Sequence, residues 1–136
     1  MIPQTRDHNV GTHNRDLGRR GENAASQWYA ASGYRILDRN WRCEHGELDL
    51  VVGRDATVVF VEVKARSSGR YGSGFDAVGR AKQRRLRRLA SAWLTERRGS
   101  RTDMGGSPDG SFATDVRFDV VDVDARGHVR VREACF

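Results

Sequence analysis

The sequence predicts an α/β fold in which helices flank a central mixed β-sheet, and three observations lead to this prediction. Apolar residues at helical spacing near the N-terminus precede three short runs with strand character. A second helical segment follows, and it is rich in arginine. Strand-like residues close the chain, so the order is α-β-β-β-α-β with one extra edge strand as an option. Such an order favours helices packed on a mixed sheet.

The first helix is expected to begin near Arg15, after a flexible leader over residues 1–14. From there, apolar and small side chains recur at three- and four-residue steps, at positions 17, 21, 24, 28 and 31. Asn14 is a suitable N-cap, and Gly33 suits the left-handed turn that often ends a helix. The length of the remaining chain predicts a single domain over residues 15–136.

Three strands are expected next, over residues 34–43, 47–53 and 57–65, and their short connections indicate an antiparallel meander. Side chains two residues apart on a strand share a face. In the second strand, one face is expected to be apolar and the other to carry acids: the first is Leu48, Leu50 and Val52, and the second is Glu47, Asp49 and Val51.

The second helix is predicted over residues 79–98, followed by a mobile, glycine-rich loop at 99–112 and by strands within 114–124 and 128–136. The apolar stripe of this helix is formed by Leu86, Leu89, Ala90, Trp93 and Leu94.

The third strand poses a chemical question, because Glu62 and Lys64 extend the face that begins with Val58 and Phe60. Burying an acid and a base costs free energy unless they are paired or hold something. The two residues are therefore either a structural ion pair or part of a site.

Asp49 favours the second alternative, because it and Glu62 are about equally far from the turn between their strands. Directly opposite residues have Cβ atoms about 4.5–5.5 Å apart, and two carboxylates that close repel each other. A divalent cation such as Mg²⁺ relieves that repulsion, and Lys64 could then assist reaction at a phosphate. Glu22 adds a third carboxylate if the first helix packs over this end of the sheet; otherwise it is a solvated acid near the start of a helix.

The second helix carries a dense run of positive charge. Six of the nine residues from 80 to 88 are basic, namely Arg80, Lys82, Arg84, Arg85, Arg87 and Arg88. Arginine forks match phosphate geometry, so this face predicts salt-sensitive binding of DNA or RNA, against the alternative of an ordinary solvated surface. Gln83 lies at the margin of the apolar stripe, where it could face the site.

The composition agrees with a nucleic-acid partner. The net charge is +6 and 31% of the residues are charged, a balance that favours polyanions. Two cysteines, Cys43 and Cys135, do not make a disulfide framework, so we expect a reducing, cytoplasmic setting. No apolar run approaches the roughly 18–20 residues of a membrane-spanning helix, so we expect no membrane association.

Several segments taken together resemble a known family. These are "LGRRGENAA", "NWRCEHGELDLVV", "VVFVEVKARSSGRYG", "AKQRRLRRLA" and "VRFDVV". In this order they resemble the bacterial YraN-like (UPF0102) family, over about residues 15–136 without the 99–112 insert. That family is similar to Holliday-junction resolvases and to the wider PD-(D/E)xK nuclease superfamily. The resemblance implies a restriction-endonuclease-like fold, a central mixed sheet flanked by helices.

The resemblance also implies a role for individual residues. Asp49 matches the metal-binding Asp of the superfamily, although Leu48 stands where a proline usually precedes it. Glu62 and Lys64 match the (D/E)xK pair, and the carbonyl of Val63 between them could also meet the metal. The remaining two matches are Glu22, the acid on the first helix of resolvase-like members, and Gln83, a polar position that can orient the site.

The expected function is that of a Mg²⁺- or Mn²⁺-dependent endonuclease acting on DNA, with branched or nicked DNA as candidate substrates. Glu22, Asp49, Glu62 and the Val63 carbonyl would hold the metal, Lys64 would assist, and the cations of the second helix would bind phosphates: Arg80, Lys82, Arg84, Arg87 and Arg88. The alternatives are a nucleic-acid-binding module with this fold but little or no cleavage, and a protein-interaction subunit. Junction resolvases act as dimers, so a homodimer is expected by analogy.

Overall fold

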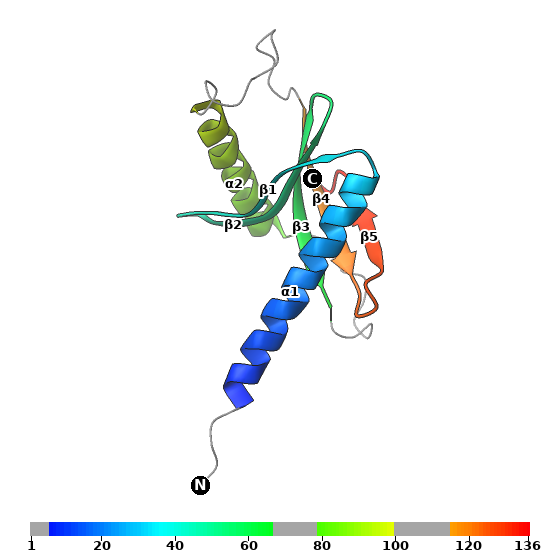
Figure 1. Ribbon diagram of the computed structural model, residues 1–136. Coiled ribbons are helices and arrows are strands. Elements are labelled where there is room, and N and C mark those ends of the chain that lie inside the picture. Colours follow the sequence, from blue (N-terminus) through cyan, green and yellow to red (C-terminus); the bar gives the residue numbers. More distant parts are fainter. Residues whose placement is uncertain (1–5, 67–78, 100–114) are drawn as a thin grey trace.

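The computed structural model describes residues 6–66, 79–99 and 115–136, and within them the side chains of 15–66, 79–97 and 115–136. Its elements, in chain order, are α1 (Arg6–Ala31), β1 (Arg35–Cys43), β2 (Gly46–Arg54), β3 (Thr57–Ala65), α2 (Arg80–Gly99), β4 (Asp115–Val123) and β5 (Val129–Arg132) (Figure 1). This is the predicted order, with β5 as the extra edge strand. Residues 1–5 of the expected leader and 100–112 of the expected mobile loop lie outside the described residues.

The five strands form one mixed sheet in the order β1-β2-β3-β4-β5. β1, β2 and β3 pair antiparallel, which confirms the predicted meander. β4 pairs parallel to β3, and β5 returns antiparallel to β4. Parallel neighbours need a long crossover connection, and α2 lies in the chain between β3 and β4. The α/β class is confirmed, and this mixed sheet between two helices is consistent with a restriction-endonuclease-like arrangement.

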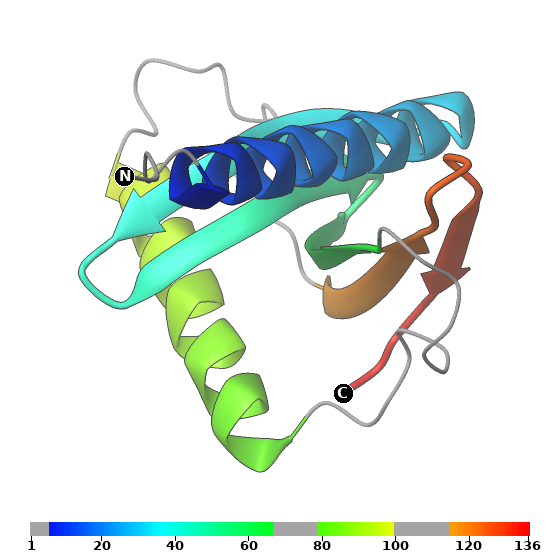
Figure 2. The same cartoon turned by 90° about the horizontal axis from the view of Figure 1, so that it is seen from below.

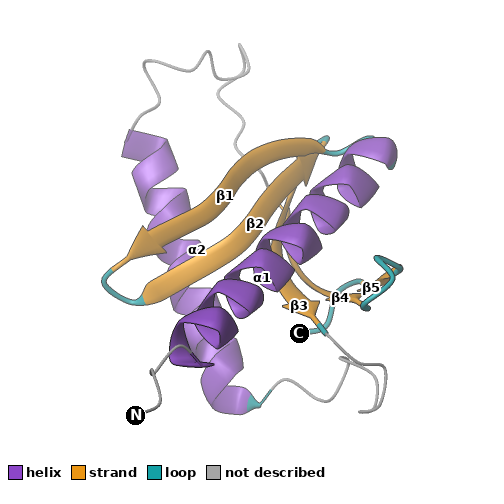
Figure 3. Cartoon of the chain, turned by 60° about the horizontal axis from the view of Figure 1, so that its bottom comes forward, coloured by secondary structure: helices purple, strands orange, loops and turns teal. Residues whose placement is uncertain are grey.

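The two helices cover opposite faces of the sheet (Figure 3), and the β1–β2 hairpin extends between them (Figure 2). Each helix closes its own hydrophobic core. The α1 core is formed by Ala25, Tyr29, Tyr34, Leu50, Val52, Val59, Val61, Val121 and Val123. The α2 core is formed by Leu48, Val51, Val58, Phe60, Leu86, Leu89, Ala90, Trp93 and Phe118.

The helix α1 begins at Arg6, so the start expected near Arg15 is wrong, and residues 6–14 of the expected leader are helical. Periodic apolar residues mark only the part of a helix that packs on a core, and residues 6–14 contain no proline that would end the turns. The expected stop at Gly33 is confirmed. Gly33 has a φ of 88°, its N–H donates to Ala30 O, and the Tyr34 N–H donates to Tyr29 O, which together close the helix.

The predicted faces of β2 are partly wrong. Leu48 packs in the α2 core, whereas Leu50 and Val52 pack in the α1 core. Val51 is completely buried in the α2 core and does not accompany the acids. A helix covers each face of β2, so apolar residues are needed on both faces. Between Leu48 and Leu50 the alternation of faces shifts by one residue, and the pattern of polar and apolar residues does not reveal this shift.

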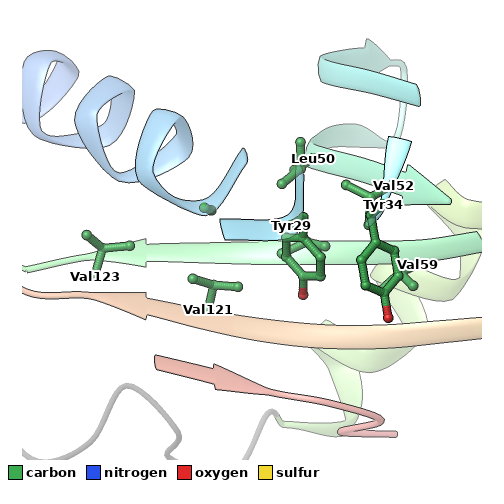
Figure 4. Packing of buried hydrophobic residues seen from close by; sticks show 9 residues of the cluster. Tyr29, Tyr34, Leu50, Val52, Val59, Val121 and Val123 are labelled. Atoms are coloured by element: carbon green, nitrogen blue, oxygen red, sulfur yellow. The ribbon is translucent and has the colours of Figure 1, made fainter. Parts of the chain in front are cut away.

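A buried carboxylate ties the α1 core to the end of the chain. Asp119 of β4 accepts hydrogen bonds from the Tyr29 hydroxyl at 2.7 Å, from Arg117 Nε and Nη2 at 2.9 Å each, and from the Ala134 N–H at 3.0 Å. Figure 4 shows the hydroxyl groups of Tyr29 and Tyr34 directed toward β4. Burial, and then the Asp119 charge, raise the pKa of Tyr29 above its ordinary value, so this hydroxyl remains a donor.

Neither of the two described helices is both long enough and apolar enough to cross a membrane.

Candidate functional site

Asp49 lies where β2 and β3 separate. Their ladder ends with Leu50 opposite Val61, and the same register carried one residue further would place Asp49 opposite Glu62. The ladder does not continue. Instead Asp49 Oδ2 accepts a hydrogen bond of 2.9 Å from the backbone N–H of Val63. The Asp49 carboxylate is therefore held against the backbone between Glu62 and Lys64.

Two further acids meet Asp49 at this point. One carboxylate oxygen each of Glu22, Glu47 and Asp49 lies within 4.8 Å of the others, and all three residues are half-buried. Glu22 comes from α1 and the other two from β2. The helix packs closely here because Gly21 has no side chain: a Cβ at that position would lie 2.8 Å from the Ala65 Cβ.

The crowding of these acids affects the ionisation of Asp49. The pKa of Asp49 is raised to about 7. Burial is the largest cause, the Val63 N–H opposes it, and the charges of Glu62, Glu22 and Glu47 add to it in that order. Glu62 is thus close enough to act on Asp49 through its charge. Gathered carboxylates that repel one another are the donor set that Mg²⁺ and Mn²⁺ prefer, so these residues fit such an ion.

Glu62 itself is bound by a residue of α2. Lys82 Nζ lies 2.7 Å from Glu62 Oε1, so the cation expected to bind nucleic-acid phosphates is engaged with a predicted metal ligand. The pairing follows from helical geometry, because Lys82 lies one turn before Leu86 and shares the side of α2 that faces the sheet.

The other predicted residues surround this pair. Lys64 is half-buried at the end of β3, and among the residues that the structure describes it forms no ion pair. The backbone N–H of Val63 donates to Asp49, whereas the predicted metal ligand at this residue is the Val63 carbonyl, which takes no part in that hydrogen bond. Gln83 is half-buried in the same turn of α2 as Lys82.

The outer side of α2 is strongly cationic. The side chains of Arg80, Arg84, Arg85, Arg87 and Arg88 are all exposed, whereas Leu86, Leu89, Ala90 and Trp93 are buried. Arg87 also lies over the Phe136 ring, with its guanidinium carbon 5.8 Å from the ring centroid. The exposed face begins in the same turn as Lys82, whose ammonium contacts Glu62.

Two features of the site were not predicted from the sequence. Glu47 joins Glu22 and Asp49, and its position two residues before Asp49 was the signal that could have identified it. The Lys82–Glu62 contact had a weaker signal, the four-residue step from Lys82 to the apolar stripe of its helix.

Comparison with known proteins agrees with the resemblance seen in the sequence motifs. A UPF0102 protein of Frankia casuarinae is 50% identical over 117 residues, which cover 85% of this chain and 89% of that protein. Another, from Beutenbergia cavernae, is 46% identical over 107 residues, covering 79% and 80%. A third, from Symbiobacterium thermophilum, is 44% identical over 118 residues, covering 87% and 90%.

The family model described as "Uncharacterised protein family UPF0102" matches residues 21–123, a range that contains every candidate site residue. The match covers most of the chain, and the alignments with the three relatives cover most of the length of each relative. The chain therefore belongs to the uncharacterised protein family UPF0102.

Proposed function

We propose that this protein is a Mg²⁺- or Mn²⁺-dependent endonuclease that hydrolyses phosphodiester bonds of DNA in the cytoplasm. One observation carries the proposal: Asp49 is held on the backbone of the Glu62-Val63-Lys64 segment, and Glu22 and Glu47 meet it there. Two free cysteines, Cys43 and Cys135, accord with a reducing compartment.

Each group has a distinct task in this proposal. Glu22, Glu47 and Asp49, together with Glu62 and the Val63 carbonyl, would hold the cation, which supplies Lewis-acid activation when bound. The Lys64 ammonium would stabilise negative charge that develops on the phosphate, because it lies on the strand that carries Glu62 and has no ion-pair partner in the described part of the chain. Gln83 would help to orient these groups from α2.

The exposed arginines of α2 would bind the backbone of the nucleic acid. They lie on the helix that also reaches Glu62, so a strand bound along this face would pass the acids. Guanidinium groups bind phosphate without reading the bases. This favours recognition of backbone shape, and branched or nicked DNA presented to two copies of the chain is the substrate we would test first.

A cleavage assay tests the proposal. Four-way junctions, nicked and intact duplexes, and RNA of the same sequence are incubated with protein and Mn²⁺ or Mg²⁺, and with EDTA. We expect metal-dependent cleavage of DNA that Asp49→Asn and Lys64→Met reduce at least about 100-fold, as loss of groups that stabilise charge in the transition state does. Asp55→Asn removes an exposed acid at the distant β2–β3 turn and is the matched control.

Two results would contradict the endonuclease. Cleavage that survives Asp49→Asn and Lys64→Met would show that it does not come from the proposed site. Salt-sensitive binding of DNA without cleavage of any substrate, by folded protein in either metal, would leave a nucleic-acid-binding module instead.

A further inference from the structure

The Glu62 carboxylate is engaged by a lysine of α2. Lys82 Nζ lies 2.7 Å from Glu62 Oε1, and the two side chains are only 31% and 19% exposed. Water and salt screen a pair at this depth less than a pair on the surface. Lys82 is therefore a well-placed positive charge on a residue that the proposed function assigns to cation binding.

The position of Lys82 is set by the packing of its helix. Leu86 and Leu89 bury the same side of α2 in the α2 core, and the indole Nε1–H of Trp93 donates to Asp38 Oδ2 of β1 at 3.0 Å. A helix anchored at these points holds Lys82 in reach of Glu62, whereas the exposed Arg84 lies on another side of the helix.

We propose that Lys82 and a divalent cation compete for Glu62, and that the displaced lysine binds a phosphate of the nucleic acid. This inference rests on the proposed function, because it takes Glu62 as part of the cation site. The ammonium already occupies Oε1, one of the two oxygens that Glu62 can offer an ion, and two positive charges bound to one carboxylate repel each other. Lys82 is accordingly a positioning residue of the cation site.

The displaced ammonium has a natural new partner. It lies in the first turn of α2, and the exposed Arg85 lies three residues further along, on the neighbouring side of the helix. When the cation is bound, Lys82 is free to bind a phosphate that approaches the exposed face of α2. When the cation is absent, Lys82 stays paired with Glu62. Binding of the cation and of the nucleic acid should then strengthen each other, as linkage requires.

Titration with Mn²⁺ alone, in the absence of nucleic acid, tests the competition. Lys82→Met removes the charge but keeps an apolar stem, and Arg84→Met removes one charge from the same helix without touching Glu62. We expect Lys82→Met to bind Mn²⁺ about fivefold more tightly than the unaltered chain, and Arg84→Met to differ by less than about twofold. Equal changes in the two variants would overturn the inference.

A second titration separates this inference from the proposed function. In a Glu62→Gln background, Lys82→Met should no longer tighten Mn²⁺ binding, because the contact has already been removed. If Asp49→Asn and Glu62→Gln leave Mn²⁺ binding unchanged, the proposed cation site is wrong. If they weaken it while Lys82→Met behaves like Arg84→Met, only the competition is wrong.

DNA binding tests the release of the lysine, with Ca²⁺ as an ion that does not support cleavage by most Mg²⁺-dependent nucleases. We expect Lys82→Met to weaken binding about fivefold in Ca²⁺ and less than twofold in EDTA, where Glu62 keeps the lysine. An equal loss in both conditions would refute the release. Lys82→Gln replaces Lys82→Met if thermal unfolding shows that the latter is not folded.

Discussion

At the scale of single residues, the fold raises the pKa of Asp49. Its pKa is 3.8 in an ordinary setting and about 7 here, so the folded chain binds its proton between these values and the unfolded chain does not. Stability linked to Asp49 is therefore present below pH 4 and is lost as the pH rises to 7. The cost of the ionised form above pH 7 is roughly 4 kcal/mol.

We predict that Asp49→Asn, in EDTA, raises the free energy of unfolding at pH 8 and that its advantage shrinks steadily toward pH 4. Urea denaturation at several pH values measures this difference, and Asp55→Asn, at an exposed turn, should show none. A difference between Asp49→Asn and the unaltered chain that is constant with pH would contradict the raised pKa.

Asp119 is a second buried acid, and hydrogen-bond donors surround it. Its carboxylate is inaccessible to solvent and accepts hydrogen bonds from Tyr29, Arg117 and Ala134. We predict that Asp119→Asn lowers the free energy of unfolding by about 3 kcal/mol, since Arg117 loses its buried counter-charge. Chemical denaturation measures it, with Asp115→Asn at the exposed start of β4 as the control. A loss below about 1 kcal/mol would show that the network contributes little.

At the scale of the elements, the distance between α1 and β3 decides where Glu22 lies. Gly21 faces Ala65 so closely that a Cβ would lie 2.8 Å from it, whereas a Cβ at Gly18 would meet nothing within 4 Å. Alanine is better than glycine in a helix by about 1 kcal/mol. We predict that Gly18→Ala stabilises the chain by up to that amount, while Gly21→Ala destabilises it and weakens Mn²⁺ binding. Equal melting temperatures for the two variants would contradict the close packing.

The helix α2 has two functions on its two sides. Its buried side completes a core and carries Lys82, and its exposed side carries arginines that should contact phosphates. We predict that Arg84→Ala and Arg88→Ala each reduce the slope of log binding constant against log salt by about one. Fluorescence anisotropy with duplex DNA at several salt concentrations measures the slope. Arg126→Ala, on the β4–β5 turn, is the control. An equal effect there would mean that the slope depends on the net charge of the protein and not on contacts made by α2.

At the scale of the whole molecule, one sheet is covered by a helix on each face, and the site lies where the central strands separate. The strand β3 is the centre of the sheet, with β2 antiparallel on one side and β4 parallel on the other. Asp49 uses the end of the β2–β3 ladder, where a backbone N–H is left for a side chain. The end of the β2–β3 pairing thus provides the backbone N–H that holds Asp49 in the candidate site.

The order of elements, the β1–β2–β3 meander and the α2 stripe were predictable, because they depend on local periodicity and on turn residues such as Gly33. The start of α1 was not, since residues 6–14 lack the apolar spacing that signals a packed helix. The faces of β2 were misassigned at Leu48 and Val51, since a strand buried on both sides has no polar face to mark its alternation.

The sequence by itself determined the family, the α/β class, and the residue types that a cation and a phosphate would need, because each depends on composition or short-range spacing. Only the tertiary structure decided which of the acids meet. Glu47 lies beside Glu22 and Asp49, and Glu62 forms an ion pair with Lys82. These contacts connect side chains from different elements, so they depend on how closely α1 and α2 pack on the sheet.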